Sequence, residues 1–119
     1  GKYLPGQKVP AGSRATDKKS GAAMIDRWMR DDVKSAVQNL KPIAEKEGLT
    51  MGQMAVAWVL QNPNVSSAII GATKPAQIKE NVKAAGGKLS SDTRKAIDKA
   101  LNGVIERDPK KTTSPIPRA

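Results

Sequence analysis

The chain has 119 residues, with 21 Lys and Arg against 11 Asp and Glu, and its formal net charge is +10 at pH 7. It contains no Cys and no His, which excludes disulfides, thiolate metal sites and any nucleophile activated by an imidazole base. Phe is also absent and aromatic residues make up only 3%, so we expect at most one domain with an aliphatic core.

The N-terminal stretch, residues 1–22, is rich in Gly and Pro, basic and without periodicity, so it is predicted to be a long loop. The segment "AAMIDRWM" is predicted to add a short helical turn. From Asp32 apolar residues recur at helical spacing and predict a helix that is kinked at Pro42 and ends at Gly48.

A second helix is predicted over residues 51–61. Thr50 and Gln53 have the spacing of a capping box at its start. Its residues are apolar nearly all round, so we expect the helix to be largely buried, with Trp58 in the core.

The run "VSSAIIG" is short, apolar and bounded by turn residues, a pattern typical of a buried parallel strand near Ser66 to Ile70. Helices are predicted to follow over residues 75–85 and from Ser90 or Ser91 to about residue 101, and residues 106–119 are expected to form a mobile tail. One parallel strand cannot form a sheet alone. The chain also begins at Gly1 rather than Met, so it is interpreted as a piece of a longer protein.

The junction after this strand has the features of a phosphate site. A helix N-terminus presents unpaired N–H groups and the positive end of its dipole, and Pro75 suits the first helical turn. Gly71 would let a ligand approach the backbone closely, and Thr73 can either cap the helix or bind a phosphate oxygen. Lys74 adds a positive charge beside it.

Three polar residues, Gln77, Glu80 and Asn81, then fall on one face of the predicted helix. An amide and a carboxylate on an exposed face could bind the edge of an adenine. An ordinary capped amphipathic helix would carry the same residues, so their spacing alone leaves both interpretations open.

The amino-acid sequence of these segments resembles that of the aldo-keto reductases, in the branch that includes potassium-channel β subunits and bacterial glyceraldehyde-phosphate reductases. "VSSAIIGATKPAQIKENV" resembles the last strand–helix unit of that family, and "GKYLPG…GSRAT" resembles the loop after the seventh barrel strand. "LTMGQMAVAWVLQNPNVSSAIIG" is similar to the penultimate helix and eighth strand. The resemblance covers nearly all of residues 1–105. It implies an α/β fold, the C-terminal portion of a (β/α)8 barrel, of which this piece would be mostly helical.

The resemblance also implies a cofactor, NADP(H), and the reduction of carbonyl substrates, aldehydes or ketones. In this interpretation residues 66–85 form the cofactor-binding strand–helix unit, and residues 1–22 form a loop that covers the cofactor. Thr73 and Gln77 would lie near the 2′-phosphate, and Glu80 and Asn81 near the adenine. The residues expected to bind the cofactor are Lys2, Arg14, Gly71, Thr73, Lys74, Gln77, Glu80 and Asn81.

The chain departs from the wider family where many reductases carry a Lys-Ser pair and a later Arg. Here Gly71-Ala72-Thr73 and Gln77 stand instead, which weakens the expected preference for NADP over NAD, although Lys74 or Arg14 could compensate. The family's catalytic Asp, Tyr, Lys and His come from the first half of the barrel. No catalytic or metal-binding residue is therefore assigned, and the 119 residues alone are expected to be inactive.

Two other functions stay open on the sequence. Residues 43–60 have a superficial helix-turn-helix spacing which, with the charge of +10, suggests a DNA-binding module. A non-catalytic interaction module is the other, because half a barrel exposes apolar edges that would pair with the missing portion or with another copy. With the reductase interpretation we expect no nucleic-acid partner, no membrane segment and a cytoplasmic protein.

Overall fold

The computed structural model describes residues 2–112. Within these residues it is helical and contains no β-strand. The elements are η1 (Arg14–Thr16), α1 (Gly21–Ile25), η2 (Asp26–Trp28), α2 (Asp31–Gln38), α3 (Lys41–Lys46), α4 (Met51–Leu60), α5 (Pro75–Val82), α6 (Ser91–Leu101) and α7 (Pro109–Thr112).

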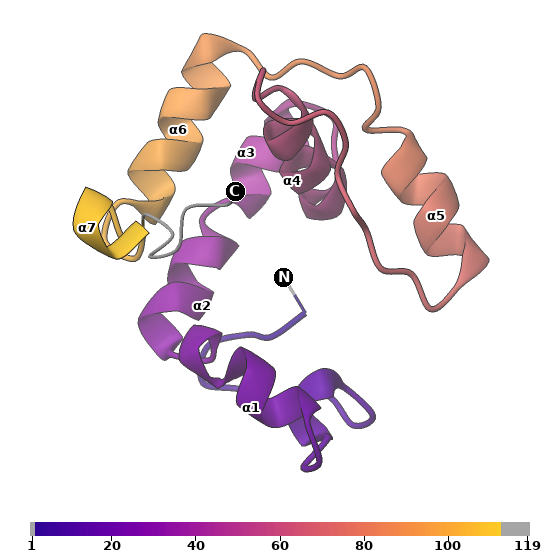
Figure 1. The fold of residues 1–119 in the computed structure, drawn as a ribbon, viewed down its shortest axis with the longest axis vertical. Coiled ribbons are helices and arrows are strands. Elements are labelled where there is room, and N and C mark those ends of the chain that lie inside the picture. Colours follow the sequence, from indigo (N-terminus) through magenta and orange to yellow (C-terminus); the bar gives the residue numbers. More distant parts are fainter. Residues whose placement is uncertain (1, 113–119) are drawn as a thin grey trace, which may run out of the picture.

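The helices form a central group, with α6 on one side of α4 and α5 on the other, and a separate N-terminal lobe (Figure 1). α3 packs against α4, and α6 contacts both α2 and α3. α5 lies on the opposite side of α4 from α6, and contacts α4 (Figure 1). α1 and the 3-10 turns on either side of it make up the lobe, which lies at the far end of α2 (Figure 1).

The N-terminal lobe is held together by polar contacts within a segment expected to be a loop. Asp17 accepts hydrogen bonds from the Lys19 N–H at 3.0 Å, the Gly21 N–H at 3.1 Å and the Ser20 hydroxyl at 3.2 Å. These bonds, that of Lys19 first, lower the pKa of Asp17. The helical turn predicted in "AAMIDRWM" is confirmed as α1 and η2.

The single kinked helix predicted from Asp32 to Gly48 is wrong, because the chain forms two helices, α2 and α3. Pro42 has no N–H with which to bond the carbonyl of Gln38, so the helical ladder stops and restarts around it. The predicted stop at Gly48 is confirmed: its φ of +66° lies in the left-handed region that ends many helices.

α4 begins as predicted, with a complete capping box. The Gln53 N–H donates to Thr50 Oγ1 at 3.2 Å, and the Thr50 N–H donates to Gln53 Oε1 at 3.0 Å. The placement of Trp58 in the core is wrong, because 47% of its surface is exposed.

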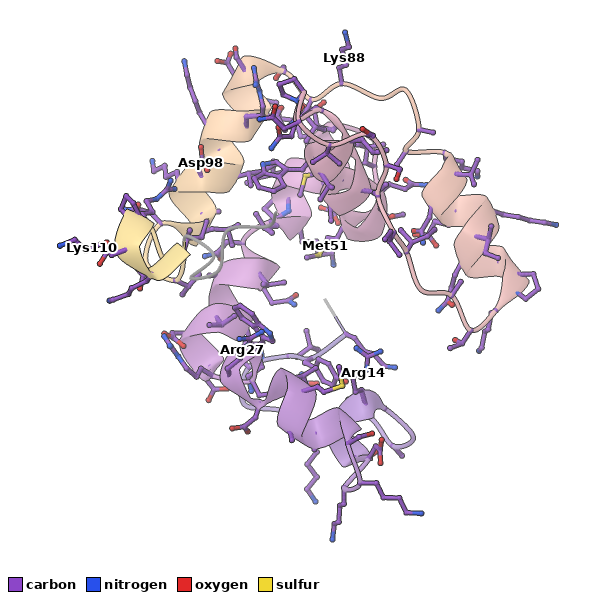
Figure 2. The ribbon with its side chains drawn as sticks, viewed as in Figure 1. Arg14, Arg27, Met51, Lys88, Asp98 and Lys110 are labelled. Carbon is purple, nitrogen blue, oxygen red and sulfur yellow. The ribbon has the colours of Figure 1, made fainter. Side chains whose placement is uncertain are left out.

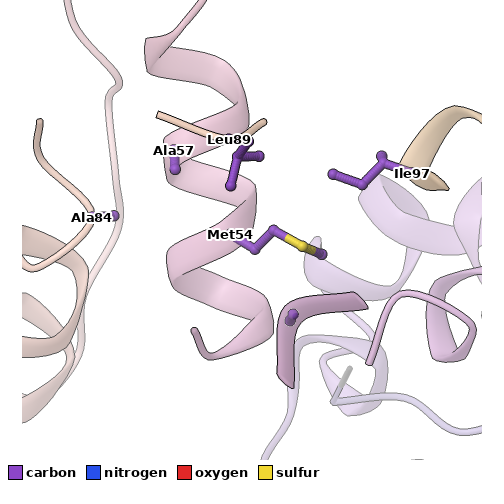
Figure 3. Packing of buried hydrophobic residues seen from close by; sticks show 6 residues of the cluster. Met54, Ala57, Ala84, Leu89 and Ile97 are labelled. Carbon is purple, nitrogen blue, oxygen red and sulfur yellow. The ribbon is translucent and has the colours of Figure 1, made fainter. Parts of the chain in front are cut away.

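The core gathers around α4 (Figure 3). Met54 and Ala57 project from α4 toward residues of α6 and of the chain after α5 (Figure 3). Ile97 of α6 is also buried in this core. The buried apolar residues of this cluster are Ala44, Met54, Ala57, Ala84, Leu89 and Ile97. Because three of the six are alanines, the core is small and the helices lie close to one another where they meet.

The strand predicted near Ser66 to Ile70 does not form in the described chain. Residues 66–70 run without regular structure, and Ile69 is 99% exposed. A strand exists only through hydrogen bonds to a neighbour, and within residues 2–112 this segment has no strand beside it. The apolar run is therefore exposed where a sheet would bury it.

The predicted helices after this segment do form, although α5 ends at Val82, earlier than residue 85. Ser90 is the N-cap of α6 and accepts from the Thr93 N–H at 3.1 Å, as predicted. Part of the expected tail, Pro109–Thr112, forms α7, and residues 113–119 lie outside the described residues. Across residues 2–112, every helix is too short or too polar to cross a membrane.

Candidate functional site

The N-terminus of α5 is organised by one side chain, that of Gln77. Its Oε1 accepts from the Thr73 N–H at 2.7 Å, the Lys74 N–H at 3.2 Å and the Thr73 hydroxyl at 3.3 Å. Pro75 occupies the first helical turn, as predicted. The N-cap residue is Lys74 rather than Thr73. Gln77, three residues after Lys74, reaches back with its side chain to accept from the backbone N–H groups of Thr73 and Lys74.

With its oxygen held in this way, the Gln77 carboxamide directs its other end outward. Nε2 forms no hydrogen bond with residues 2–112, and Thr73, Lys74 and Gln77 are all exposed. The start of α5 therefore offers an amide donor, a hydroxyl and an ammonium group within one turn. These are groups that bind phosphate oxygens.

Glu80, farther along α5, is tied to the N-terminus of α4. The Thr50 hydroxyl donates to Glu80 Oε1 at 2.7 Å, and Gln53 Nε2 donates to the main-chain oxygen of Glu80 at 3.1 Å. Gln53 is buried, and its carboxamide uses both ends, one in the capping box and one on α5. One oxygen of the Glu80 carboxylate thus helps to position α5. The other, Oε2, forms no hydrogen bond with the described residues.

Asn81 lies beside Glu80 at the same contact between α4 and α5. A Cβ added at Gly52 of α4 would meet Asn81 Oδ1 and Glu80 Oε1, each at 3.9 Å. Gly52 therefore faces the polar side of α5 without crowding it. By contrast, a Cβ at Gly71 would meet no atom within 4 Å, so the described chain itself does not require glycine there.

Of the other two predicted residues, Arg14 lies in the N-terminal lobe and Lys2 in the segment that precedes it. Tyr3 Oη accepts from the Ala15 N–H at 3.3 Å, and the nearby Ser13 side chain is the largest of the causes that lower the pKa of Tyr3. The charges of Lys2 and Arg14 lower it further, so both cations lie near this hydroxyl. Arg14 lies apart from α5 in Figure 2, so the structure does not bring Arg14 to the start of α5.

Six of the predicted residues fall within residues 71–81, and Thr50 and Gln53, which were not predicted for the site, bond one of them, Glu80. Thr50 and Gln53 were predicted as a capping box, and that signal was correct. What a local motif could not predict is that the same two side chains also bond Glu80, about thirty residues later. The polar face of α5 is therefore partly a contact surface with α4.

The same contacts weigh against the helix-turn-helix interpretation. A recognition helix needs polar side chains free to reach base edges. In α4, Gln53 is buried and bonded to α5, and Met54 and Ala57 belong to the core. α4 therefore cannot present these residues to a DNA groove.

The model of the aldo/keto reductase family matches residues 5–102. A probable voltage-gated potassium channel subunit beta from Oryza sativa subsp. japonica is 43% identical over 114 residues, which cover 96% of this chain and 34% of that protein. A protein of the same description from Arabidopsis thaliana has the same identity and coverage. Protein tas of Escherichia coli strain K12 is 37% identical over 98 residues, 82% of this chain and 27% of that protein.

The chain thus spans about a third of the length of these two potassium-channel relatives. The family model covers most of the chain, including the whole of residues 71–81, where the candidate site lies. The chain belongs to the aldo/keto reductase family.

Proposed function

We propose that this chain is the C-terminal, cofactor-binding part of a (β/α)8-barrel reductase. The complete protein would use NADP(H) to reduce aldehydes or ketones to alcohols. Family membership supports the reaction class and the barrel. In such barrels the site lies at the C-terminal ends of the strands, and residues 66–74 would supply the end of the last strand.

The start of α5 would hold the 2′-phosphate of the cofactor. In our proposal Gln77 Nε2 and the Lys74 ammonium group donate to the phosphate oxygens, and the Thr73 hydroxyl turns its proton from Gln77 Oε1 to the phosphate. The helix dipole adds to the attraction. The Gln77 side chain is already fixed by its bonds to two backbone N–H groups. Such fixing reduces the entropy lost on binding. Gly71 would let the cofactor pass close to the backbone.

The middle of α5 would bind the adenine. Glu80 Oε2 could accept from the exocyclic amine, and the Asn81 carboxamide could donate to a ring nitrogen. The bond from Thr50 orients the Glu80 carboxylate, and the bond from Gln53 orients the backbone that carries it. These contacts would align the helix face before the cofactor arrives.

Lys2 and Arg14 are proposed to approach the pyrophosphate and the 2′-phosphate when the N-terminal lobe covers the cofactor. The lobe is linked to the central helices mainly through α2, so its movement need not disrupt the core. Hydride transfer would need an acid and groups that polarise the carbonyl oxygen. These would come from the family's catalytic Asp, Tyr, Lys and His in the remaining part of the barrel, with which this chain would associate.

The observation that carries the proposal is the hydrogen-bonded carboxamide of Gln77 at the start of an exposed helix in a chain of this family. Adenosine 2′,5′-bisphosphate reproduces the end of NADP that the site would bind. Titrated into the isotope-labelled 119-residue chain, it should shift the backbone amide resonances of residues 71–81. Shifts scattered over lysines elsewhere, or no shifts, would contradict the proposal.

A further inference from the structure

A groove runs between α4 and α6, on the side of α4 away from α5. It has two adjoining parts, a cleft of about 540 Å³ and an apolar pocket of about 220 Å³. Trp58, Val59 and Asp98 line both parts. None of these residues belongs to the candidate site on α5, and Asp98 lies far from α5 in Figure 2.

The cleft is cationic. Arg94 and Lys95, in the first half of α6, line it, and within residues 2–112 neither forms an ion pair. The carboxylate in the cleft wall, that of Asp98, is paired with Arg107 at 3.5 Å. Pairing offsets this negative charge, so the cleft presents two cations with no matching anion.

The pocket beside it is apolar. Its walls include Leu40, Met51, Met54, Ile97, Leu101 and Ile105. Trp58 stands between the pocket and the cleft with 47% of its surface exposed. The other tryptophan differs in one respect: the Arg27 guanidinium covers the Trp28 ring at 4.8 Å, whereas within residues 2–112 no cation lies over Trp58.

We infer that this groove binds a small organic anion with an apolar body. The anionic head would lie in the cleft against Arg94 and Lys95, and the body would pass Trp58 into the apolar pocket. The charge of the cleft selects the head, and the lining of the pocket selects the body. The cleft also has the size of ordinary small-molecule sites.

A matched series of eight-carbon probes tests the inference on the 119-residue chain. In a Trp28→Phe background the tryptophan fluorescence reports on Trp58 alone. Octanoate should change this fluorescence in a saturable way. It should bind about tenfold more tightly than octan-1-ol, because two exposed ion pairs together contribute up to about tenfold in affinity. Its preference over octylamine should be larger still. Equal affinities for the three probes, or tighter binding of octylamine, would overturn the inference.

Two variants should change octanoate affinity in opposite directions, and a third serves as the control. The double change Arg94→Gln with Lys95→Gln should weaken octanoate binding about tenfold, whereas Lys99→Gln with Lys110→Gln, outside the groove lining, should leave it unchanged. Asp98→Asn should strengthen it severalfold, because it removes the negative charge of the groove and frees Arg107. Far-UV circular dichroism verifies that each variant is folded.

Loss of binding in both double variants, or weaker binding in Asp98→Asn, would overturn the assignment. Comparing octyl phosphate with octanoate distinguishes a phosphate head from a carboxylate head. Tighter binding of either anion than of the neutral alcohol supports the assignment. Saturating adenosine 2′,5′-bisphosphate should leave octanoate binding unaffected, since that ligand is proposed for α5. Competition between them would place the anion on α5 and overturn the groove as a separate site.

Discussion

Gln77 shows how one residue can serve structure and ligand binding together. Its Oε1 accepts from the N–H groups of Thr73 and Lys74, while its Nε2 stays available to a ligand. The sequence indicated the second use and missed the first. A change to Ala at this position would therefore disturb the helix start as well as any ligand contact.

Gln77→Glu separates these two uses. A glutamate at this position keeps the acceptor for both N–H groups and places a negative charge at the helix N-terminus, so α5 should persist. The same charge repels phosphate, so affinity for adenosine 2′,5′-bisphosphate should fall at least about tenfold. Isothermal titration calorimetry measures the loss, and adenosine, which has no phosphate, serves as the control ligand. If the bisphosphate binds Gln77→Glu as it binds the parent chain, Gln77 does not contact the phosphate.

Among the elements, the contact between α4 and α5 decides where the candidate site lies. Gln53 is buried and bonds both the Thr50 N–H and the Glu80 carbonyl. Gln53→Leu keeps a similar volume and removes both bonds. It should lower the free energy of unfolding by about 1–3 kcal/mol, because buried partners are left unpaired.

Urea denaturation measures this change, and amide spectra should show the largest shifts in α5. Gln61→Leu is the matched control, since Gln61 follows the end of the same helix and its side chain forms no hydrogen bond with residues 2–112. A stability loss as large in the control would mean that the bonds to α5 contribute little.

The elements also show where sequence reasoning succeeds. The start of α4 was predictable because Thr50 and Gln53 are three residues apart, and the start of α6 because Ser90 is a local cap. The break before Pro42 was underestimated, since a missing N–H can bend a helix or end it. The strand could not be settled locally, because residues 66–70 need a neighbouring strand, and none lies within residues 2–112.

For the whole molecule, the separation of Arg14 from α5 limits what the chain can do alone (Figure 2). A cofactor bound at α5 would need both the lobe and the rest of the barrel to complete its surroundings. The sequence contains no His, and its single Tyr, Tyr3, is engaged within the lobe. The 119-residue chain should therefore show no oxidation of NADPH with a small aldehyde above background. Clear turnover, absent when Tyr3 is changed to Phe, would show that a catalytic group lies within this chain.

The central claim, that α5 holds the 2′-phosphate end of NADP, is tested most directly by one comparison of affinities. Calorimetric titration of the chain with adenosine 2′,5′-bisphosphate and with adenosine 5′-monophosphate, at matched ionic strength, isolates the contribution of the 2′-phosphate. The bisphosphate should bind at least about tenfold more tightly than the monophosphate, since Thr73, Lys74 and Gln77 are proposed to donate to the 2′-phosphate. Equal affinities, or no binding of either nucleotide, would show that α5 does not hold the 2′-phosphate.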